Sequence, residues 1–249
     1  MTRQKNETFF DNISSFYDGM ISFKTALERR KSVLSKFIND SMHTAADLGS
    51  GSGLDSVSIA LSGLSVTAFD QSEGMLDKAR SNASDFGLDV QFVKSSIDKI
   101  NKKFYNRFDV AFSLGNTLAN LSPEKLPEAL GKIRLILNEK GTAVLQVLNY
   151  SQILKENNRI INITEMNGEV YVRFYDFLPE RLNFNILKFK KDKPSERSLY
   201  TTSLYPHTKE VFQKLLKEAG FRKIKFYGSL GLQKFEKFTS KDLIITAVK

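Results

Sequence analysis

Residues 44–60 read TAADLGSGSGLDSVSIA. The apolar residues at the start of this stretch are typical of the end of a buried strand, and the residues from Asp55 onward indicate the first turns of a helix. The glycines between them let the backbone reverse tightly and remove the Cβ atoms that would hold a ligand away from the main chain. The helix that follows points its free N–H groups at the same place. The stretch therefore predicts a strand, a turn and a helix that together hold a small molecule.

An acidic residue supports this prediction. Residues 64–69 (LSVTAF) predict a second buried strand, and Asp70 follows it about 20 positions after the glycines, where a carboxylate can accept the hydroxyls of a nucleotide ribose. A dinucleotide fingerprint G-x-G-x-x-G would place its third glycine at Leu54, whereas here it falls at Gly53. Asp47, two residues before the first glycine, would repel a pyrophosphate but could hold an ammonium group. The pattern therefore favours S-adenosylmethionine over a dinucleotide.

Three stretches together resemble the class I S-adenosylmethionine-dependent methyltransferases: residues 47–53 (DLGSGSG), 69–76 (FDQSEGML) and 108–117 (FDVAFSLGNT). Within them, residues 53–56 (GLDS) and 114–118 (LGNTL) resemble the glycine N-methyltransferase branch and its small-molecule relatives. The resemblance implies S-adenosylmethionine as the cofactor. It also implies an α/β fold with a Rossmann-like, seven-stranded, mostly parallel sheet whose last strand is antiparallel.

The same resemblance implies which residues hold the cofactor. Met75 would lie over the ribose or the adenine, or would fill the core. Family members place an acid for the adenine amino group after the third strand, but residues 94–97 read KSSI here. Adenine contacts are therefore expected from hydroxyl or backbone groups at Ser96 and from the side chain of Ile97. The predicted cofactor-binding residues are Asp47, Gly49, Ser50, Gly51, Gly53, Asp70, Gln71, Met75, Ser96, Ile97, Leu114 and Gly115.

Composition limits the class of protein. The 249-residue chain is 41% apolar and 26% charged, an ordinary globular composition. No apolar run reaches the roughly 18 residues of a membrane span, and the polar start from Met1 to Glu7 is unlike a signal peptide, so we expect a cytoplasmic protein without membrane contact. With no cysteine there is no disulfide, thiolate metal site or cysteine nucleophile, and we expect no metal. The formal charge of +9 leaves two interpretations open, a solvated lysine surface or a nucleic-acid footprint.

We expect one methyltransferase domain over residues 1–249, in four parts. Residues 1–40 are predicted to form an N-terminal lid of two helices, and residues 41–150 the cofactor-binding core. Residues 151–206 are predicted to be a small antiparallel insertion over the site that covers the substrate. Residues 207–249 supply a helix and a strand pair that complete the sheet.

Turn and capping residues place several elements. Asn167-Gly168 is a strong hairpin signal between the first two strands of the insertion. In the core, the Ser-Pro-Glu step at 122–124 predicts the start of a helix, and residues 138–141 (NEKG) predict a turn before a fifth strand. The N-terminal helices are predicted over residues 8–20 and 26–38, and the insertion strands over 160–165, 170–177, 182–189 and 199–205.

Tyr17 and Asn116 are the candidates for the catalytic centre. In the resembling family the tyrosine of a Phe-Tyr-Asp step, here Tyr17, lies against the methyl-transfer site; the alternative is a packing aromatic in an amphipathic helix. Asn116 follows the fourth strand without the Asx-Pro-Pro-aromatic step of enzymes that methylate amide or adenine nitrogens. Its amide would suit a small amine or carboxylate, or would satisfy its own turn. The predicted substrate contacts are Tyr17, Asn116, Asn149, Tyr150, Arg173, Tyr175 and Tyr205.

Cations and histidines near the site are few. Where the glycine branch has an arginine for the cofactor's carboxylate, this chain offers Lys24 or Arg30. Where glycine-methylating relatives have an arginine for the substrate carboxylate, the closest position is Leu148, which argues against glycine itself as the acceptor. His43 precedes the first strand, at the wrong edge of the sheet for chemistry. His207 is either a base near the site or a residue at the start of a helix.

Methyl transfer from a sulfonium is an in-line displacement that alignment and exclusion of water can accelerate. We therefore expect a methyltransferase that acts on a small amine, hydroxyl or carboxylate compound. One alternative is methylation of RNA or another macromolecule docked through the basic surface. Another is a protein that binds S-adenosylmethionine without catalysis, and a nicotinamide oxidoreductase is disfavoured by the glycine spacing. The sequence leaves the acceptor and the oligomeric state open.

Overall fold

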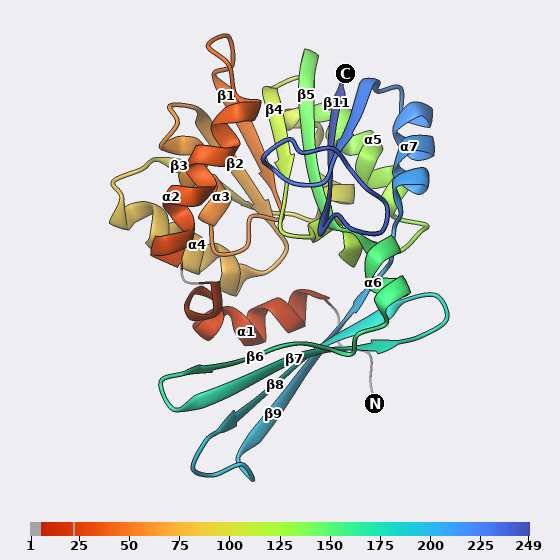
Figure 1. Ribbon diagram of the computed structural model, residues 1–249. Coiled ribbons are helices and arrows are strands. Elements are labelled where there is room, and N and C mark those ends of the chain that lie inside the picture. The colour runs from red at the N-terminus through yellow and green to blue at the C-terminus, as the bar shows by residue number, and fades with distance from the viewer. Residues whose placement is uncertain (1–5, 22) are drawn as a thin grey trace.

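The computed structural model describes residues 6–21 and 23–249 (Figure 1). Positions 1–5 and 22 of the predicted N-terminal lid lie outside the described residues. Seven strands form one sheet in the order β10-β11-β5-β4-β1-β2-β3. β11 is antiparallel to both of its neighbours and the other pairs are parallel, which confirms the predicted fold class. The strands are β1 (Thr44–Leu48), β2 (Ser65–Asp70), β3 (Val90–Lys94), β4 (Phe108–Ser113), β5 (Leu137–Leu148), β10 (Arg222–Tyr227) and β11 (Asp242–Val248).

Helices cover both faces of this sheet, because each central strand buries apolar side chains on both of its sides. On one face Val66 and Val110 pack with apolar residues of α2 and α3. On the other face Ala111 and Leu145 pack with residues of α5 and α7. The helices around the sheet are α2 (Phe23–Leu34), α3 (Leu54–Ala60), α4 (Glu73–Asp85), α5 (Leu126–Ile136) and α7 (Lys209–Glu218). Among the described residues, no helix combines the length and the apolar character that crossing a membrane requires.

The insertion is a separate sheet of four antiparallel strands in the order β6-β7-β8-β9. A short helix, α6 (Tyr150–Glu156), leads into it from the end of β5. Asn167 and Gly168 have φ angles of 52° and 77°, the left-handed pair that a two-residue hairpin turn requires. The strands are β6 (Ile160–Met166), β7 (Glu169–Phe177), β8 (Leu182–Lys190) and β9 (Arg197–Leu204), close to the predicted ranges.

The helix α1 (Asn6–Ile21) lies between the two sheets (Figure 1). Phe9 and Ile13 of α1 form one apolar cluster with Tyr171 and Ile186 of the insertion and with Met75 at the start of α4. The insertion is therefore attached to the core partly through this helix and partly through Tyr175, Leu182 and Leu204, which belong to the apolar cluster of the main sheet.

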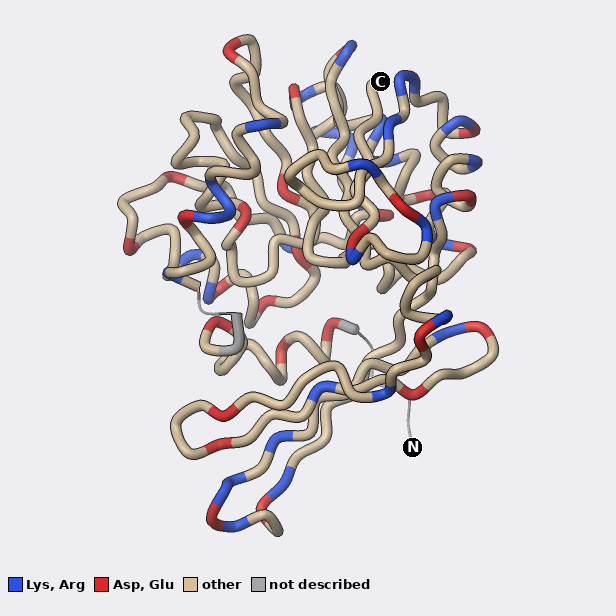
Figure 2. Tube along the Cα trace, in the orientation of Figure 1, with Lys and Arg blue, Asp and Glu red and all other residues tan. Residues whose placement is uncertain are grey.

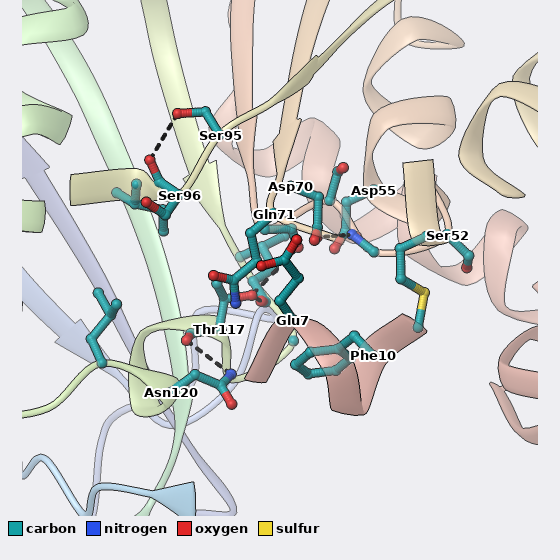
Figure 3. Close-up of a pocket in the computed structure, with 18 of the residues that line it drawn as sticks. Glu7, Phe10, Ser52, Asp55, Asp70, Gln71, Ser95, Ser96, Thr117 and Asn120 are labelled. Atoms are coloured by element: carbon teal, nitrogen blue, oxygen red, sulfur yellow. Dashed lines mark hydrogen bonds between the residues drawn. The ribbon is translucent and has the colours of Figure 1, made fainter. Parts of the chain in front are cut away.

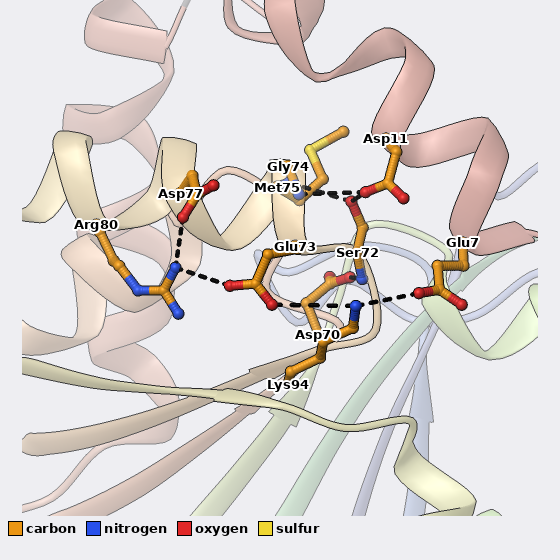
Figure 4. A network of polar contacts seen from close by, with 10 residues as sticks. All are labelled: Glu7, Asp11, Asp70, Ser72, Glu73, Gly74, Met75, Asp77, Arg80 and Lys94. Atoms are coloured by element: carbon orange, nitrogen blue, oxygen red, sulfur yellow. Dashed lines mark hydrogen bonds and ion pairs between the residues drawn. The ribbon is translucent and has the colours of Figure 1, made fainter.

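A polar contact fastens α1 to the first turn of α4 (Figure 4). The Oδ1 atom of Asp11 accepts hydrogen bonds from the Ser72 hydroxyl at 2.5 Å and from the Gly74 N–H at 3.2 Å. Ser72 is also the residue that caps α4, because its hydroxyl accepts the Met75 N–H at 3.1 Å. A negative charge at this position is favourable because the free N–H groups of a helix N-terminus are electropositive.

Two local predictions in the core were inaccurate. The helix predicted to start at Ser122 starts at Leu126 instead, because the Ser122 carbonyl closes a turn by accepting the N–H groups of Lys125 and Leu126. The turn predicted at residues 138–141 lies inside β5. It is a bulge, since Phe108 pairs with Leu137 but the next paired residue of β4 lies opposite Thr142.

We expect Asp11→Ala to loosen α1 without unfolding the core. The lost charged hydrogen bonds are worth about 1–2 kcal/mol, so backbone amides of α1 should exchange with deuterium roughly tenfold faster while those of β1 and β4 do not change. Asp85→Ala removes an exposed carboxylate at the other end of α4 and serves as the control. Unchanged hydrogen-exchange rates of the α1 amides in the Asp11 variant would show that these hydrogen bonds do not hold α1 against α4.

Candidate cofactor and substrate site

A cavity of about 780 Å³ lies at the carboxyl ends of the core strands (Figure 3). The glycine turn after β1, the end of β2 and the loops after β3 and β4 form its walls. Glu7, Phe10 and Tyr17 of α1 close it from the side of the insertion, and Ser203 and Tyr205 at the end of β9 complete it. This is the place where open α/β sheets hold their ligands.

The glycine turn is held against the end of β2 and leaves its backbone open to the cavity. The N–H groups of Gly49 and Ser50 donate to the Phe69 carbonyl at 2.7 and 3.1 Å. Gly49 has a φ of 77°, and a Cβ atom there would lie 2.2 Å from Cγ2 of Thr117. Gly51 also has a positive φ, and no atom lies within 4 Å of the place its Cβ would occupy. The backbone can therefore approach a ligand closely at this turn.

Asp70 stands beside this turn. Its carboxylate accepts the Gly51 N–H at 2.8 Å on one oxygen and the Ser72 N–H at 2.9 Å on the other. Burial raises the pKa of Asp70, although these backbone hydrogen bonds act against the rise. Gln71 and Met75 line the cavity next to it. The carboxylate therefore lies at the cavity wall beside the glycine turn, and its contact with ribose hydroxyls stays a prediction.

Three carboxyl groups, those of Asp47, Asp55 and Asp70, gather around the turn. Burial, and then the charge of Asp55, raise the pKa of Asp47 to about 8 even though the Ser56 hydroxyl donates to its carboxylate at 2.5 Å. Burial raises the pKa of Asp55 as well. Desolvated carboxylates that raise one another's pKa favour a cationic ligand, such as an ammonium or sulfonium group.

Of the two cations considered for the cofactor's carboxylate, Arg30 reaches the cavity and Lys24 does not line it. The Nε atom of Arg30 lies 3.0 Å from Oδ1 of Asp55. This ion pair joins α2 to α3 at the cavity wall, which both side chains line. Ala26, one turn earlier on α2, also lines it.

At the adenine end, Ser96 and Ile97 line the cavity as predicted, together with Ser95, whose hydroxyl donates to the Ser96 carbonyl at 3.0 Å (Figure 3). Asp98, which was not among the predicted residues, is 5% exposed, lines the same wall and lies 3.9 Å from Lys125 Nζ. An acid two positions after the expected one was the signal that could have identified it. Other cavity residues that were not predicted are Glu7, Phe10, Thr117, Asn120, Leu121 and Ser203.

Tyr17 and Tyr205 are the predicted substrate residues that line the cavity. Burial, and then the charges of Asp55 and Asp70, raise the pKa of Tyr17, so its hydroxyl stays protonated at neutral pH. Leu114 and Gly115 line the cavity between the glycine turn and this end. The cavity is therefore bordered by a neutral phenol at Tyr17.

Asn116, Asn149 and Tyr150 lie outside the cavity wall, because their polar groups are used inside the protein. The Asn116 amide donates to the Tyr150 hydroxyl at 2.9 Å and accepts the Leu148 N–H at 3.0 Å. The Asn149 amide donates to the carbonyls of Lys237 and Ser240. The structure thus places these groups in contacts that hold the ends of β4, β5 and β11 together.

The remaining predicted residues have different positions. Tyr175 is buried in the apolar cluster that joins the insertion to the main sheet, and Arg173 is half-buried on the face of β7 toward α1. His207 is buried, its Nε2 atom lies 2.8 Å from the Leu121 carbonyl, and burial lowers its pKa. His207 therefore holds the loop after β4 and does not line the cavity. Asp47 and Gly53 do not line the cavity. A Cβ atom on Gly53 would lie 3.0 Å from the Cβ atom of Ala79, so the turn packs closely against α4.

The site fits a nucleoside with a cationic tail. Within the described part of the chain, the hydroxyls of Ser50 and Ser52 are buried without a hydrogen-bond partner, and both residues line the cavity. Unpaired buried hydroxyls are costly unless a ligand supplies the partner. Together with the open backbone at Gly51 and the acids around it, they form a cradle for a polar ligand.

Comparisons with known proteins agree with this geometry. Residues 45–141 match a family model described as a methyltransferase domain. A glycine/sarcosine N-methyltransferase from Halorhodospira halochloris is 28% identical over 232 residues, which cover 91% of this chain and 84% of that protein. A solved S-adenosylmethionine-dependent methyltransferase from Clostridium acetobutylicum has a TM-score of 0.80 at 17% identity, with 96% of this chain and 98% of the other covered. The CcbJ methyltransferase from Streptomyces caelestis has a TM-score of 0.80 at 20% identity, with 98% of both chains covered.

The strand order, the glycine turn with its acid and these matches identify the chain as a class I S-adenosylmethionine-dependent methyltransferase. S-adenosylmethionine is accordingly its cofactor. Within the class, its motifs resemble the glycine N-methyltransferase branch and its small-molecule relatives.

We expect Asp47→Asn to stabilise the protein and to weaken cofactor binding. The folded-state pKa of Asp47 is about 8, above the roughly 3.9 of an unfolded chain, so wild type loses stability as the pH rises between these two values. The free energy of unfolding of the variant should exceed that of wild type by roughly 1–3 kcal/mol at pH 8, and the gain should vanish near pH 4, where both side chains are neutral.

Urea denaturation from pH 4 to pH 8 measures this difference, and titration calorimetry with S-adenosylmethionine measures the lost affinity. Asp89→Asn changes an exposed carboxylate and is the matched control. A variant that is less stable than wild type at pH 8 would show that the Asp47 charge is not desolvated.

Proposed function

We propose that the protein transfers a methyl group from S-adenosylmethionine to the amine nitrogen of a small molecule that also carries a carboxylate. The observation that carries this proposal is Arg173, a half-buried arginine on the α1 side of the insertion, beside Tyr17. Support for an amine acceptor comes from relatives described as glycine/sarcosine N-methyltransferases.

Arg173 lies on the face of β7 toward α1, close enough to Tyr17 for the two groups to interact electrostatically. It pairs across the strands with Ile186, whose side chain packs against α1. Its Nε atom donates to Asn162 Oδ1 at 2.9 Å, which fixes the plane of the guanidinium. Burial lowers the pKa of Arg173, and the neighbouring Tyr17 acts in the opposite direction.

Among the residues that the structure describes, no carboxylate forms an ion pair with this guanidinium. Burying a cation without a counter-ion is costly, and a bidentate carboxylate is the partner that a guanidinium fits best. A substrate carboxylate would supply it. This also explains how the chain can do without an arginine at the position of Leu148.

The residues around the acceptor act by alignment. S-adenosylmethionine supplies an electrophilic methyl group on a sulfonium, which the lone pair of the acceptor nitrogen displaces in line. Tyr17 can accept an N–H of the amine through its neutral phenol oxygen and so orient the lone pair. Phe10 and the rest of α1 exclude water, which would otherwise solvate the amine. No general base is required, since the product ammonium can release its proton after it leaves.

The surface gives no support to a macromolecular acceptor. Acidic and basic residues alternate over both layers of the molecule (Figure 2), and many lysines pair with a glutamate or aspartate. A nucleic-acid footprint would concentrate one sign of charge along one face.

The test is an acceptor screen that measures S-adenosylhomocysteine release. Small amines with and without a carboxylate, hydroxyl compounds and simple carboxylates form the panel. We expect turnover with the amines that carry a carboxylate. With the best of them, Arg173→Met should raise its KM roughly 10- to 100-fold while the affinity for S-adenosylmethionine stays the same.

Arg222→Met, at an exposed position on β10, is the matched control. Equal turnover of amines that lack a carboxylate, or an unchanged KM in the Arg173 variant, would contradict the proposed acceptor class. A screen in which only hydroxyl compounds are methylated would overturn the amine as well.

A further inference from the structure

The insertion sheet has one face against α1 and a second face that none of the described helices or strands covers (Figure 1). On the covered face, Tyr171 and Ile186 pack with α1. On the second face, Ile163 of β6 is 61% exposed and Leu199 of β9 is 51% exposed. Because side chains alternate along each strand, every second row of paired residues points to this second face.

One of these rows is apolar from edge to edge. Ile163 pairs with Val172, Val172 with Leu187, and Leu187 with Leu199, so the row crosses all four strands. Contiguous exposed apolar surface of this kind marks an interaction site. Apolar residues in the flanking rows are Ile160, Val170, Phe174 and Phe189.

A neighbouring row carries opposite charges at its two ends. Glu165 on β6 pairs with Val170, Val170 with Phe189, and Phe189 with Arg197 on β9. Glu165 and Arg197 are both exposed, and they lie at opposite edges of the same sheet, so they do not contact each other. Lys191 Nζ lies 3.1 and 2.9 Å from the two carboxylate oxygens of Glu165, but the Glu165 side chain is 49% exposed and so remains accessible to a second cation.

We propose that two copies of this chain pack face to face through this surface, about a two-fold axis parallel to the strands. Such an axis places β6 of one copy over β9 of the other. Each row of paired residues then lies over the same row of the second copy. Ile163 of one copy then lies over Leu199 of the other, and Glu165 of one copy lies over Arg197 of the other, twice in the dimer. The two sheets stack about 10 Å apart with aligned strands, a common packing of antiparallel sheets.

The charges select this axis. A two-fold axis across the strands would keep the apolar row on itself but would place Glu165 over Ile160 of the opposite flanking row and leave its charge buried against an aliphatic side chain. The surface also has a suitable size, since four strands of up to nine residues cover roughly 19 by 30 Å, on the scale of a standard interface of about 800 Å² per partner.

The full-length protein provides the test, by light scattering after size exclusion and by sedimentation over a range of concentrations. We expect wild type to have the mass of two chains, and Ile163→Lys and Leu199→Lys to raise the dimer dissociation constant at least roughly 100-fold. Leu154→Lys, at an equally exposed leucine of α6 outside the surface, is the control and should remain a dimer. Unchanged circular dichroism and S-adenosylmethionine binding in the lysine variants would show that they are folded.

Charge reversal tests the axis. Glu165→Arg and Arg197→Glu should each weaken the dimer roughly tenfold, and the double variant, which restores both cross-copy pairs, should recover the wild-type dissociation constant. A monomeric wild type, a dimer that tolerates both lysine variants, or a double variant no better than the single ones would overturn the proposal. So would a monomer that sediments with phosphatidylglycerol vesicles through Ile163, because the surface would then serve a membrane.

Discussion

The burial of three carboxyl groups beside the glycine turn is the constraint on which the rest of the site depends. Asp47 and Asp70 are held at the ends of adjacent parallel strands, and Asp55 opens the helix behind them. Burial raises the pKa of all three carboxyl groups. Ion pairing with Arg30 offsets part of this cost, and a cationic ligand offsets more. Burial of these carboxyl groups therefore lowers the free energy of unfolding of the protein without ligand, and binding of the cationic cofactor raises it.

The helix α1 connects this constraint to the choice of acceptor. One side of it closes the cofactor cavity with Phe10 and Tyr17, and the other side packs on the insertion sheet at Ile186. Arg173 occupies the same face of that sheet. Any movement of α1 therefore changes the cofactor cavity and the proposed acceptor contact at Arg173 together.

The sequence predicted the elements whose signals are local. The glycine turn, the hairpin at residues 167–168 and the antiparallel insertion were correct because backbone conformation and side-chain alternation are set by neighbouring residues. Asn116 and Asn149 were assigned to the substrate, but their amides bind groups far away in the chain, such as the Lys237 carbonyl. No spacing rule contains such partners. Asp98 was missed for a similar reason, since its burial depends on the packing of the loop against α5.

The most direct test of this account is titration calorimetry of the wild-type protein and of Asp70→Ala with S-adenosylmethionine, S-adenosylhomocysteine and NADH. The account predicts that wild type binds both sulfur nucleosides and not NADH, and that the variant loses at least roughly tenfold in affinity because two ribose hydroxyls lose their acceptor. Failure of a folded sample to bind either sulfur nucleoside, or equal binding of NADH, would contradict it.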